Sequence, residues 1–410
     1  MIARVTPHPL SGELAAVKSK SYAHRMLIAA ALSGGGLDFG DSEDAYHTAQ
    51  ALASLGFDAK FSDTSVHYGV FHNGTEPRLV SVGESGSSLR FLLPLAAALG
   101  VNASFETEGR LASRPMGALV EELSRHGVTA TANSVKGQLT AGLYEIDATI
   151  SSQFVTGLLM ALPILSGDSE IRLMGKVVSA PYIEITLEVL EKSGIVVGRT
   201  ERGFLVPGGQ RYALTTDLVP GDFSGAAFPL VAGSLGEGVS VKGLDPTSAQ
   251  GDKEILRFIE SAGGVVKVEK DKITVKKGAL TAFRAQIGET PDLAPILAVL
   301  AAFAEGESVL EQVSRLRDKE SDRLAAIREM LSRAGIDSRE EGDALVITGG
   351  QPQGAAFCAF ADHRIAMSEA ILAAFATGES SIDDMICVKK SYPRFWEDFA
   401  CIGGKYEVER

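Results

Sequence analysis

The chain has 410 residues, 45% hydrophobic and 22% charged, so it can bury a large core in two or three domains. Its net charge of −13 argues against nucleic acid or an anionic membrane as the main partner, although a local group of cations could still bind a small anion. Three scattered cysteines, no secretory signal and no apolar run near the ~20 residues of a membrane span lead us to expect a cytoplasmic protein.

In chain order, strongly apolar helices that end near a glycine recur along the whole sequence. They are predicted at His24–Leu32, Ser87–Gly100, Ser151–Gly167, Phe223–Gly236, Pro291–Gly306 and His363–Gly378. Residues marking their starts are 65, 63, 71, 68 and 72 positions apart: Arg25, Arg90, Gln153, Ser224, Asp292 and Arg364. This near-constant spacing predicts six repeats.

Amphipathic helices are predicted between the apolar ones. They cover Ala45–Gly56, Pro115–Gly127, Ile183–Gly194, Asp252–Gly263, Lys319–Gly335 and Pro393–Gly403. Most precede an alternating hairpin pattern, clearest at Val265–Glu269 and Lys272–Lys276 around Lys270-Asp271. We therefore predict an α/β fold of two domains with three repeats each, in which the apolar helices are central and the sheets lie outside. A tandem solenoid remains the alternative.

Small, polar and cationic residues gather where the apolar helices begin. The segments concerned are Ser19–Arg25, Gly83–Arg90, Ser151–Gln153, Gly221–Gly225, Pro291-Asp292 and Asp362–Arg364. Helix N-termini with free N–H groups, glycines and added arginines are typical of phosphate or carboxylate sites. One such segment alone would indicate ordinary N-capping. Their recurrence predicts an anion site in a cleft that all six helix starts face.

A further charged segment precedes the apolar spacing of Leu324–Leu331. We predict a helix with Asp318 as N-cap and Glu320 in its first turn, which places Lys319 and Arg323 on one face. The alternative is a solvated helix start held by salt bridges. Signals for metal, nucleotide or nucleophile chemistry are absent from the sequence.

Eight motifs in register resemble the 5-enolpyruvylshikimate-3-phosphate synthase family over nearly the whole chain. They are Ser19-Lys20-Ser21-x-x-x-Arg25, Gly83-x-Ser85-Gly86-Ser87-x-x-Arg90, Arg114-Pro115-Met116-Gly117, Ser151-Ser152-Gln153, Pro291-Asp292-Leu293-Ala294-Pro295, Lys319-Glu320-Ser321-Asp322-Arg323, Asp362-His363-Arg364-x-Ala366-Met367 and Cys387-x-Lys389-Lys390-Ser391-Tyr392-Pro393. The resemblance implies two inside-out α/β domains of βαβαββ-type units, with the active site in the interdomain cleft. It places residues 15–222 in one domain and residues 1–14 with 223–410 in the other, with crossings near 10–18 and 219–223.

The resemblance also implies an activity without metal or cofactor. The enolpyruvyl group of phosphoenolpyruvate is transferred to the 5-hydroxyl of shikimate 3-phosphate, through a tetrahedral intermediate, with induced fit as the domains close. Asp292 is implied as base and Glu320 as proton donor, with Lys20 assisting. The residues implied to hold phosphoenolpyruvate are Lys20, Gly86, Arg114, Gln153, Arg323, Arg364 and Lys390. Those implied to hold shikimate 3-phosphate are Lys20, Ser21, Arg25, Ser151, Ser152, Gln153, Ser179, Tyr182, Asp292, Arg315 and Lys319.

Several positions depart from the family pattern and concern the shikimate side of the site. They are Val17-Lys18, His24, Glu84, Ala180 and Arg315. The nearest alternative is the sister enzyme that acts on UDP-N-acetylglucosamine, but no cysteine occurs in the loop Gly109–Pro115, where that family carries a reactive one. A non-catalytic anion-binding homologue is the other alternative. We expect a monomer that acts on small molecules.

Overall fold

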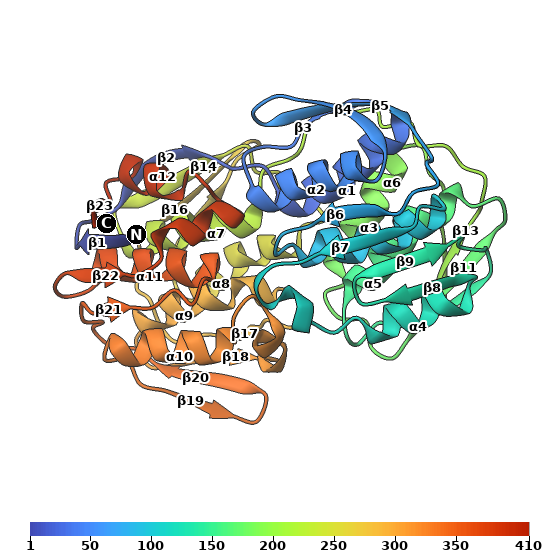
Figure 1. Cartoon of the computed structure of the whole chain (residues 1–410). Helices are drawn as coiled ribbons and strands as arrows, with labels where there is room; N and C mark the ends of the chain where they lie inside the picture. The colour runs from blue at the N-terminus through green and yellow to red at the C-terminus, as the bar shows by residue number, and fades with distance from the viewer. Residues whose placement is uncertain (410) are drawn as a thin grey trace. The chain divides into compact units, whose positions relative to one another are not determined.

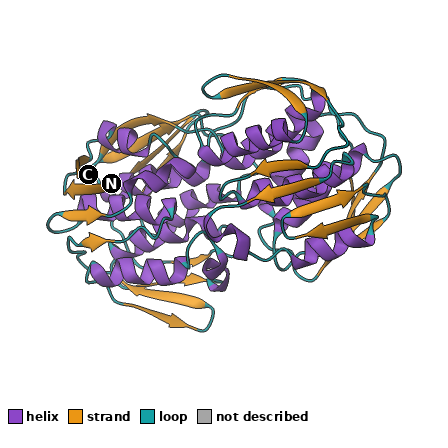
Figure 2. Cartoon of the chain, in the orientation of Figure 1, coloured by secondary structure: helices purple, strands orange, loops and turns teal. Residues whose placement is uncertain are grey.

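The computed structural model describes residues 1–409, and the chain forms two compact units (Figure 1). Unit 1 contains Met1–Ser19 and Pro220–Arg410, and unit 2 contains Lys20–Val219. Both alternate strands with helices, and both place helices inside and sheets outside (Figure 2). Within the described part of the chain, no helix is long and apolar enough to cross a membrane.

Unit 2 is built around three central helices whose residues are almost all buried: α1 (Lys20–Ser33), α3 (Gly86–Ala98) and α5 (Ser152–Ala161). Because they are apolar on nearly every face, only a fully enclosed position keeps them out of water. Amphipathic helices flank them: α2 (Glu43–Ser54), α4 (Gly117–Arg125) and α6 (Pro181–Lys192). Two 3-10 helices complete the set: η1 (Gly109–Ser113) and η2 (Leu162–Ile164).

Three sheets cover unit 2, in the orders β3-β5-β4, β6-β7-β9-β8 and β10-β11-β13-β12. Their strands are β3 (Gly36–Asp38), β4 (Phe57–Phe61), β5 (Ser65–Phe71), β6 (Arg78–Ser81), β7 (Ala103–Glu106), β8 (Val128–Thr131), β9 (Ser134–Gly137), β10 (Leu143–Asp147), β11 (Ser169–Met174), β12 (Gly198–Thr200) and β13 (Gly203–Val206). Strands such as β10 bury alternate residues, here Tyr144 and Ile146.

Unit 1 repeats the plan. Its central helices are α7 (Phe223–Leu235), α9 (Ala294–Ala302) and α11 (His363–Phe375), and its flanking helices are α8 (Ile255–Ser261), α10 (Arg323–Arg333) and α12 (Phe395–Cys401). Four short 3-10 helices connect them: η3 (Gly251–Glu254), η4 (Pro291–Leu293), η5 (Ser314–Asp318) and η6 (Met385–Lys390). The core of this unit is one continuous cluster that includes Phe228, Leu297 and Ile371.

The sheets of unit 1 have the orders β21-β22-β1-β23, β15-β16-β14-β2 and β17-β18-β20-β19. Their strands are β1 (Ile2–Thr6), β2 (Ser11–Ala15), β14 (Gly238–Lys242), β15 (Val265–Val268), β16 (Lys272–Lys276), β17 (Arg284–Gln286), β18 (Glu307–Glu311), β19 (Ser338–Glu341), β20 (Ala344–Thr348), β21 (Ala356–Phe357), β22 (Ser380–Ile382) and β23 (Lys405–Glu409).

One pairing rule recurs in three of the four-stranded sheets, β6-β7-β9-β8, β10-β11-β13-β12 and β17-β18-β20-β19. The strands before and after a central helix pair in parallel, as β17 and β18 do around α9, and a hairpin then adds antiparallel strands. The N-terminus completes two sheets of unit 1, because β1 pairs with β22 and β23 and β2 lies parallel to β14. In unit 2, Asp38 of the three-stranded sheet forms a parallel bridge with Leu218 where a fourth strand would lie.

The predicted inside-out α/β class is confirmed, as are the six buried helices and the hairpin of β15 and β16. The predicted start of the helix after residue 318 is wrong. Helix α10 begins at Arg323, and its N-cap is Asp322, which accepts a hydrogen bond from the amide of Ala325 at 3.0 Å. Lys319 has an extended backbone, so Lys319 and Glu320 precede the helix instead of lying on its first turn.

Candidate active site

In unit 1, three cations converge on one carboxylate. Asp292, on η4, accepts from Arg323 Nη1 at 2.7 Å and from Arg364 Nη2 at 3.0 Å. Lys319 Nζ lies 3.5 Å from the same side chain. These four residues were implied as site residues, and they come from three helix starts of the unit. The fold therefore assembles them locally.

The guanidinium of Arg323 holds this cluster together. Its side chain is only 1% exposed, and besides Asp292 it donates to Glu320 Oε2 at 2.7 Å and to Asp362 Oδ2 at 2.8 Å. Asp362 is itself fully buried and accepts from Ser321 Oγ and from the backbone amide of Arg364. One planar donor thus fixes three carboxylates, with two of them, Asp292 and Glu320, in the positions implied for base and acid.

The electrostatics follow from this pairing. Burial alone would raise the pKa of Asp292, but Arg364, Lys319 and Arg323 hold it well below its usual value. Burial would lower the pKa of Arg323, but Asp362, Glu320 and Asp292 raise it well above the ordinary value. Burial lowers the pKa of Lys319. At neutral pH both the Asp292 carboxylate and the Arg323 guanidinium are therefore charged.

Two implied residues of unit 1 lie on neighbouring 3-10 helices. Arg315 is on η5, which packs against α10, and its charge acts on Lys319. Lys390 is buried at the end of η6, which packs against α11.

In unit 2, three of the implied phosphoenolpyruvate residues, Gly86, Arg114 and Gln153, lie at or beside the starts of α3 and α5. Arg90 Nη1 donates to Gln153 Oε1 at 2.5 Å, and Gln153 Nε2 donates to Ser87 Oγ at 2.9 Å. The Arg114 guanidinium lies against Gly86 so closely that an added Cβ at this glycine would come within 2.8 Å of Arg114 Nη1. A side chain at this position would therefore displace the guanidinium of Arg114 from its place beside the helix start.

Arg25 is buried among neutral acceptors. Its guanidinium donates to Thr186 Oγ1, Thr156 Oγ1 and the carbonyl oxygens of Ser21 and Tyr182, all of them uncharged. Burial lowers its pKa to about 9. Among residues 1–409, no carboxylate forms an ion pair with this guanidinium, so its charge is surrounded by neutral dipoles only.

Four further implied residues lie at the starts of α1, α5 and α6. Lys20 pairs with the buried Asp44 at 2.7 Å. The side chain of Ser151 caps α5 by accepting from the amide of Gln153, and Ser152 is buried in the first turn. Ser179 has a φ of 54°, which a non-glycine residue rarely adopts and which is enriched at functional positions.

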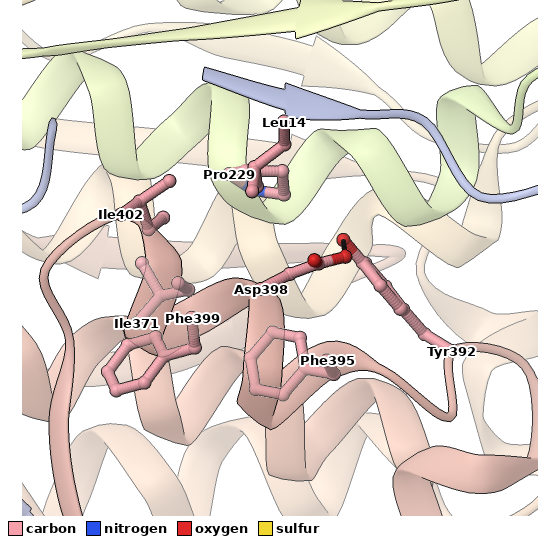
Figure 3. A pocket seen from close by; sticks show the side chains of 8 residues that line it. All are labelled: Leu14, Pro229, Ile371, Tyr392, Phe395, Asp398, Phe399 and Ile402. Carbon is pink, nitrogen blue, oxygen red and sulfur yellow. Dashed lines mark hydrogen bonds between the residues drawn. The ribbon is translucent and has the colours of Figure 1, made fainter. Parts of the chain in front are cut away.

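The pocket in Figure 3 is a different feature of unit 1. Its lining is mostly apolar, with a hydrogen bond from the Tyr392 hydroxyl to Asp398 Oδ2 at 2.8 Å. The lining residues are Leu14, Pro229, Ile371, Tyr392, Phe395, Asp398, Phe399 and Ile402. None is an implied site residue, and a small apolar hollow does not suit a doubly anionic ligand.

Three residues were not among the implied set although they position its members: Asp44, Arg90 and Asp362. Arg90 and Asp362 stand in the helix-start motifs, so their place at a site was visible, but their partners were not. Asp44 carries no signal in the sequence, because an acid in the first turn of a helix is common.

The cluster of unit 1 offers carboxylates suited to proton transfer, and each unit by itself offers cations suited to anionic ligands. Comparison with known proteins agrees with this chemistry. The model of the family "EPSP synthase (3-phosphoshikimate 1-carboxyvinyltransferase)" matches residues 5–399.

Two curated relatives and one solved structure illustrate the similarity. The 3-phosphoshikimate 1-carboxyvinyltransferases of Clostridium kluyveri and Methanosarcina acetivorans are 38% and 35% identical to this chain, over 98% of it and 97% of each relative. An EPSP synthase structure from Acinetobacter baumannii covers 100% of both chains with a TM-score of 0.85 at 24% identity, which supports the fold. The chain belongs to the EPSP synthase family.

Proposed function

We propose that this chain transfers the enolpyruvyl group of phosphoenolpyruvate to the 5-hydroxyl of shikimate 3-phosphate, releases phosphate, and so serves the shikimate pathway to aromatic amino acids. Family membership supports the reaction. The observation that supports catalysis over anion binding alone is a pair of acids, Asp292 and Glu320, which are fixed on the buried guanidinium of Arg323. A protein that only bound anions would use the cations and would gain nothing from two carboxylates beside them.

The reaction proceeds in two stages. In the first, the oxygen of the 5-hydroxyl bonds to C2 of phosphoenolpyruvate while Asp292 accepts the proton of this hydroxyl. Glu320 gives a proton to C3, so that a tetrahedral intermediate forms. In the second, C3 loses a proton, the double bond is restored and phosphate leaves C2. Lys20 assists these proton movements.

Asp292 is a weak base while three cations hold it. Arg323, Arg364 and Lys319 keep its pKa well below the ordinary value, as burial cannot overcome them. Phosphate and carboxylate groups of the donor would share Arg323 and Arg364, and this sharing would raise the basicity of Asp292. Donor binding thereby prepares the base for the acceptor hydroxyl.

Unit 2 supplies the remaining contacts in this proposal. Arg114 and Gln153, at the starts of α3 and α5, hold the donor together with Gly86 and with Lys390 of unit 1. Arg25, Ser151 and Ser179 lie among the shikimate 3-phosphate residues, together with Ser21, Ser152, Tyr182, Arg315 and Lys319. The neutral acceptors around Arg25 support this role because they leave its charge uncompensated.

The test is phosphate release from phosphoenolpyruvate by the whole protein. We expect release with shikimate 3-phosphate and only background release without an acceptor or with UDP-N-acetylglucosamine. The double variant D292N/E320Q, assayed in parallel, controls for contaminating phosphatase. Release that depended on UDP-N-acetylglucosamine instead, or binding of both substrates without any turnover, would overturn the proposal.

A further inference from the structure

The start of α7 carries a buried acid that the proposed reaction does not use. Ser224, in the first turn of α7, donates from Oγ to Asp252 Oδ2 at 2.5 Å. Asp252 lies on η3 and is 5% exposed. Its second oxygen, Oδ1, is buried and has no hydrogen-bond partner among residues 1–409. Half of this carboxyl group is therefore unsatisfied, although buried polar atoms normally have partners.

Asp252 lies within electrostatic reach of the reacting cluster. Helix α7 packs against η3, against η4 with Asp292, and against α11 with Arg364. The charged groups that act on Asp252 are Asp292, Arg364 and Asp222, the N-cap of α7. The neighbouring Lys253 instead donates to the carbonyl oxygen of Ser248 at 2.7 Å. Of the three charged groups that act on Asp252, only Arg364 is positive.

These surroundings determine the charge of Asp252. Burial, and then the carboxylate of Asp292, raise its pKa to about 7, whereas Arg364 and the hydrogen bond from Ser224 act in the opposite direction. The acid thus gains or loses its charge near neutral pH. The neutral form of Asp252 does not attract Arg364, whereas its anion attracts the guanidinium of Arg364 in competition with Asp292.

We propose that Asp252 is a positioning residue for donor binding: as a neutral acid it leaves the guanidinium of Arg364 to Asp292 and the anionic donor, and as a carboxylate it competes for that guanidinium. The inference rests on the proposed function, since Arg364 is a phosphoenolpyruvate residue there. It assigns a role to the start of α7, the one central helix of unit 1 that contributes no group to the reaction itself. A purely structural role would bind Ser224 and leave substrate affinity independent of this charge.

The experiment measures kcat and KM for phosphoenolpyruvate from pH 5.5 to 9 in three proteins: wild type, D252N and S224A. Asn keeps the size of Asp252 and can accept from Ser224, but it cannot become an anion. We expect equal KM values for wild type and D252N at pH 6, and a wild-type KM about fivefold higher at pH 8.5, the effect of one nearby charge partly screened by solvent. Substrate phosphates titrate identically in all three proteins, so the differences isolate Asp252.

The Ser224 variant tests the same idea independently. Removing the hydrogen bond that lowers the pKa of Asp252 should move the rise in KM to higher pH. Parallel KM profiles of wild type and D252N, both turning over, would overturn the inference, and so would an unchanged profile in S224A. Should D252N fail to fold, S224A alone decides. A wild-type protein without turnover would instead remove the proposed function.

Discussion

The two units begin their helices with different chemistry. In unit 1, Asp222, Asp322 and Asp362 cap α7, α10 and α11, whereas in unit 2 the caps of α3 and α5 are Ser85 and Ser151. A carboxylate cap neutralises the positive end of the helix, but a hydroxyl cap satisfies the same amide and leaves the positive potential in place. The second arrangement favours an external anion.

The buried arginines show the same contrast. Arg323 of unit 1 is held by three carboxylates, which raise its pKa against the effect of burial. Arg25 of unit 2 is held by hydroxyl and carbonyl oxygens, and burial lowers its pKa. The difference shows that helix starts of the same repeated fold can hold a buried arginine in two ways. In the proposed function, unit 2 would keep cations for its ligands, and unit 1 would use cations to fix the acids that move protons.

The largest expected effect concerns the acids of unit 1. We expect E320Q to lower kcat by about 10²–10⁴-fold while leaving substrate binding largely intact, because Gln keeps the contact to Arg323 but cannot donate a proton as the acid does. Steady-state kinetics and a binding titration with shikimate 3-phosphate measure both quantities. The matched control is E340Q, which alters a carboxylate that also accepts from arginines, Arg317 and Arg328, but outside the cluster. Near-normal turnover in E320Q would exclude this role.

The second prediction compares the two buried arginines directly. R323M leaves the fully buried Asp362 without its main counter-charge, and we expect it to reduce the free energy of unfolding by about 3–5 kcal/mol. R25M leaves only neutral acceptors without a donor and also removes a desolvated charge, so we expect a smaller loss of about 1–2 kcal/mol. Urea denaturation of both variants measures the losses. Equal losses of free energy of unfolding would mean that the neutral acceptors around Arg25 and the carboxylates around Arg323 stabilise their arginines to the same extent.

The third prediction exchanges the caps. S151D can still accept from the amide of Gln153, so α5 should keep its start, but its added negative charge would repel an anionic substrate. We expect KM for shikimate 3-phosphate to rise at least about tenfold. The reverse exchange in unit 1, D322S, controls for the replacement of a cap and should leave this KM unchanged. An unaltered KM in S151D would show that the start of α5 does not face the ligand.

The sequence predicted the fold well where one physical cause dominated. Helices such as α7 and α9 are apolar on every face, so their burial follows from composition alone, and glycines close to their ends limit their length. The predicted start of α10 was wrong because several residues of 314–322 can cap a helix. Tertiary contacts decide among them: residues 314–318 form η5, and Arg323 is drawn into the cluster around Asp362.

The sequence marks the residues of the cluster around Asp292, but not their pairings. Charged and small residues at helix starts stand out in the sequence, and for this reason Asp292, Arg323 and Arg364 were proposed as site residues. Their partners depend on the fold, because Arg323 and Asp362 are 39 residues apart and Lys20 and Asp44 are 24 apart. Asp252 was seen only as the start of an amphipathic helix, since nothing in its neighbourhood in the sequence indicates a buried acid.

The last prediction concerns a pH dependence of stability in unit 2, where His24 lies on α1 between Lys20 and Arg25. Its Nδ1 is 2.6 Å from Thr48 Oγ1, its Nε2 is buried without a partner among residues 1–409, and burial lowers its pKa to about 3. The folded state thus binds a proton less tightly than the unfolded chain, whose histidine has a pKa of about 6.5. Stability is unaffected above this value and is lost as the pH falls toward 3.

At pH 5, protonation of His24 in the unfolded chain should therefore cost about 2 kcal/mol of stability, which H24N would not lose. We expect the difference in free energy of unfolding between H24N and wild type to shift by this amount in favour of the variant between pH 7.5 and pH 5, measured by urea denaturation. H67N, at an exposed position of β5, is the control. A difference that stays constant between the two pH values would mean that the neutral surroundings of Arg25 accept a second cation at His24. The contrast with unit 1 would then lie in the acids that hold Arg323 and not in the burial of neutral groups around Arg25.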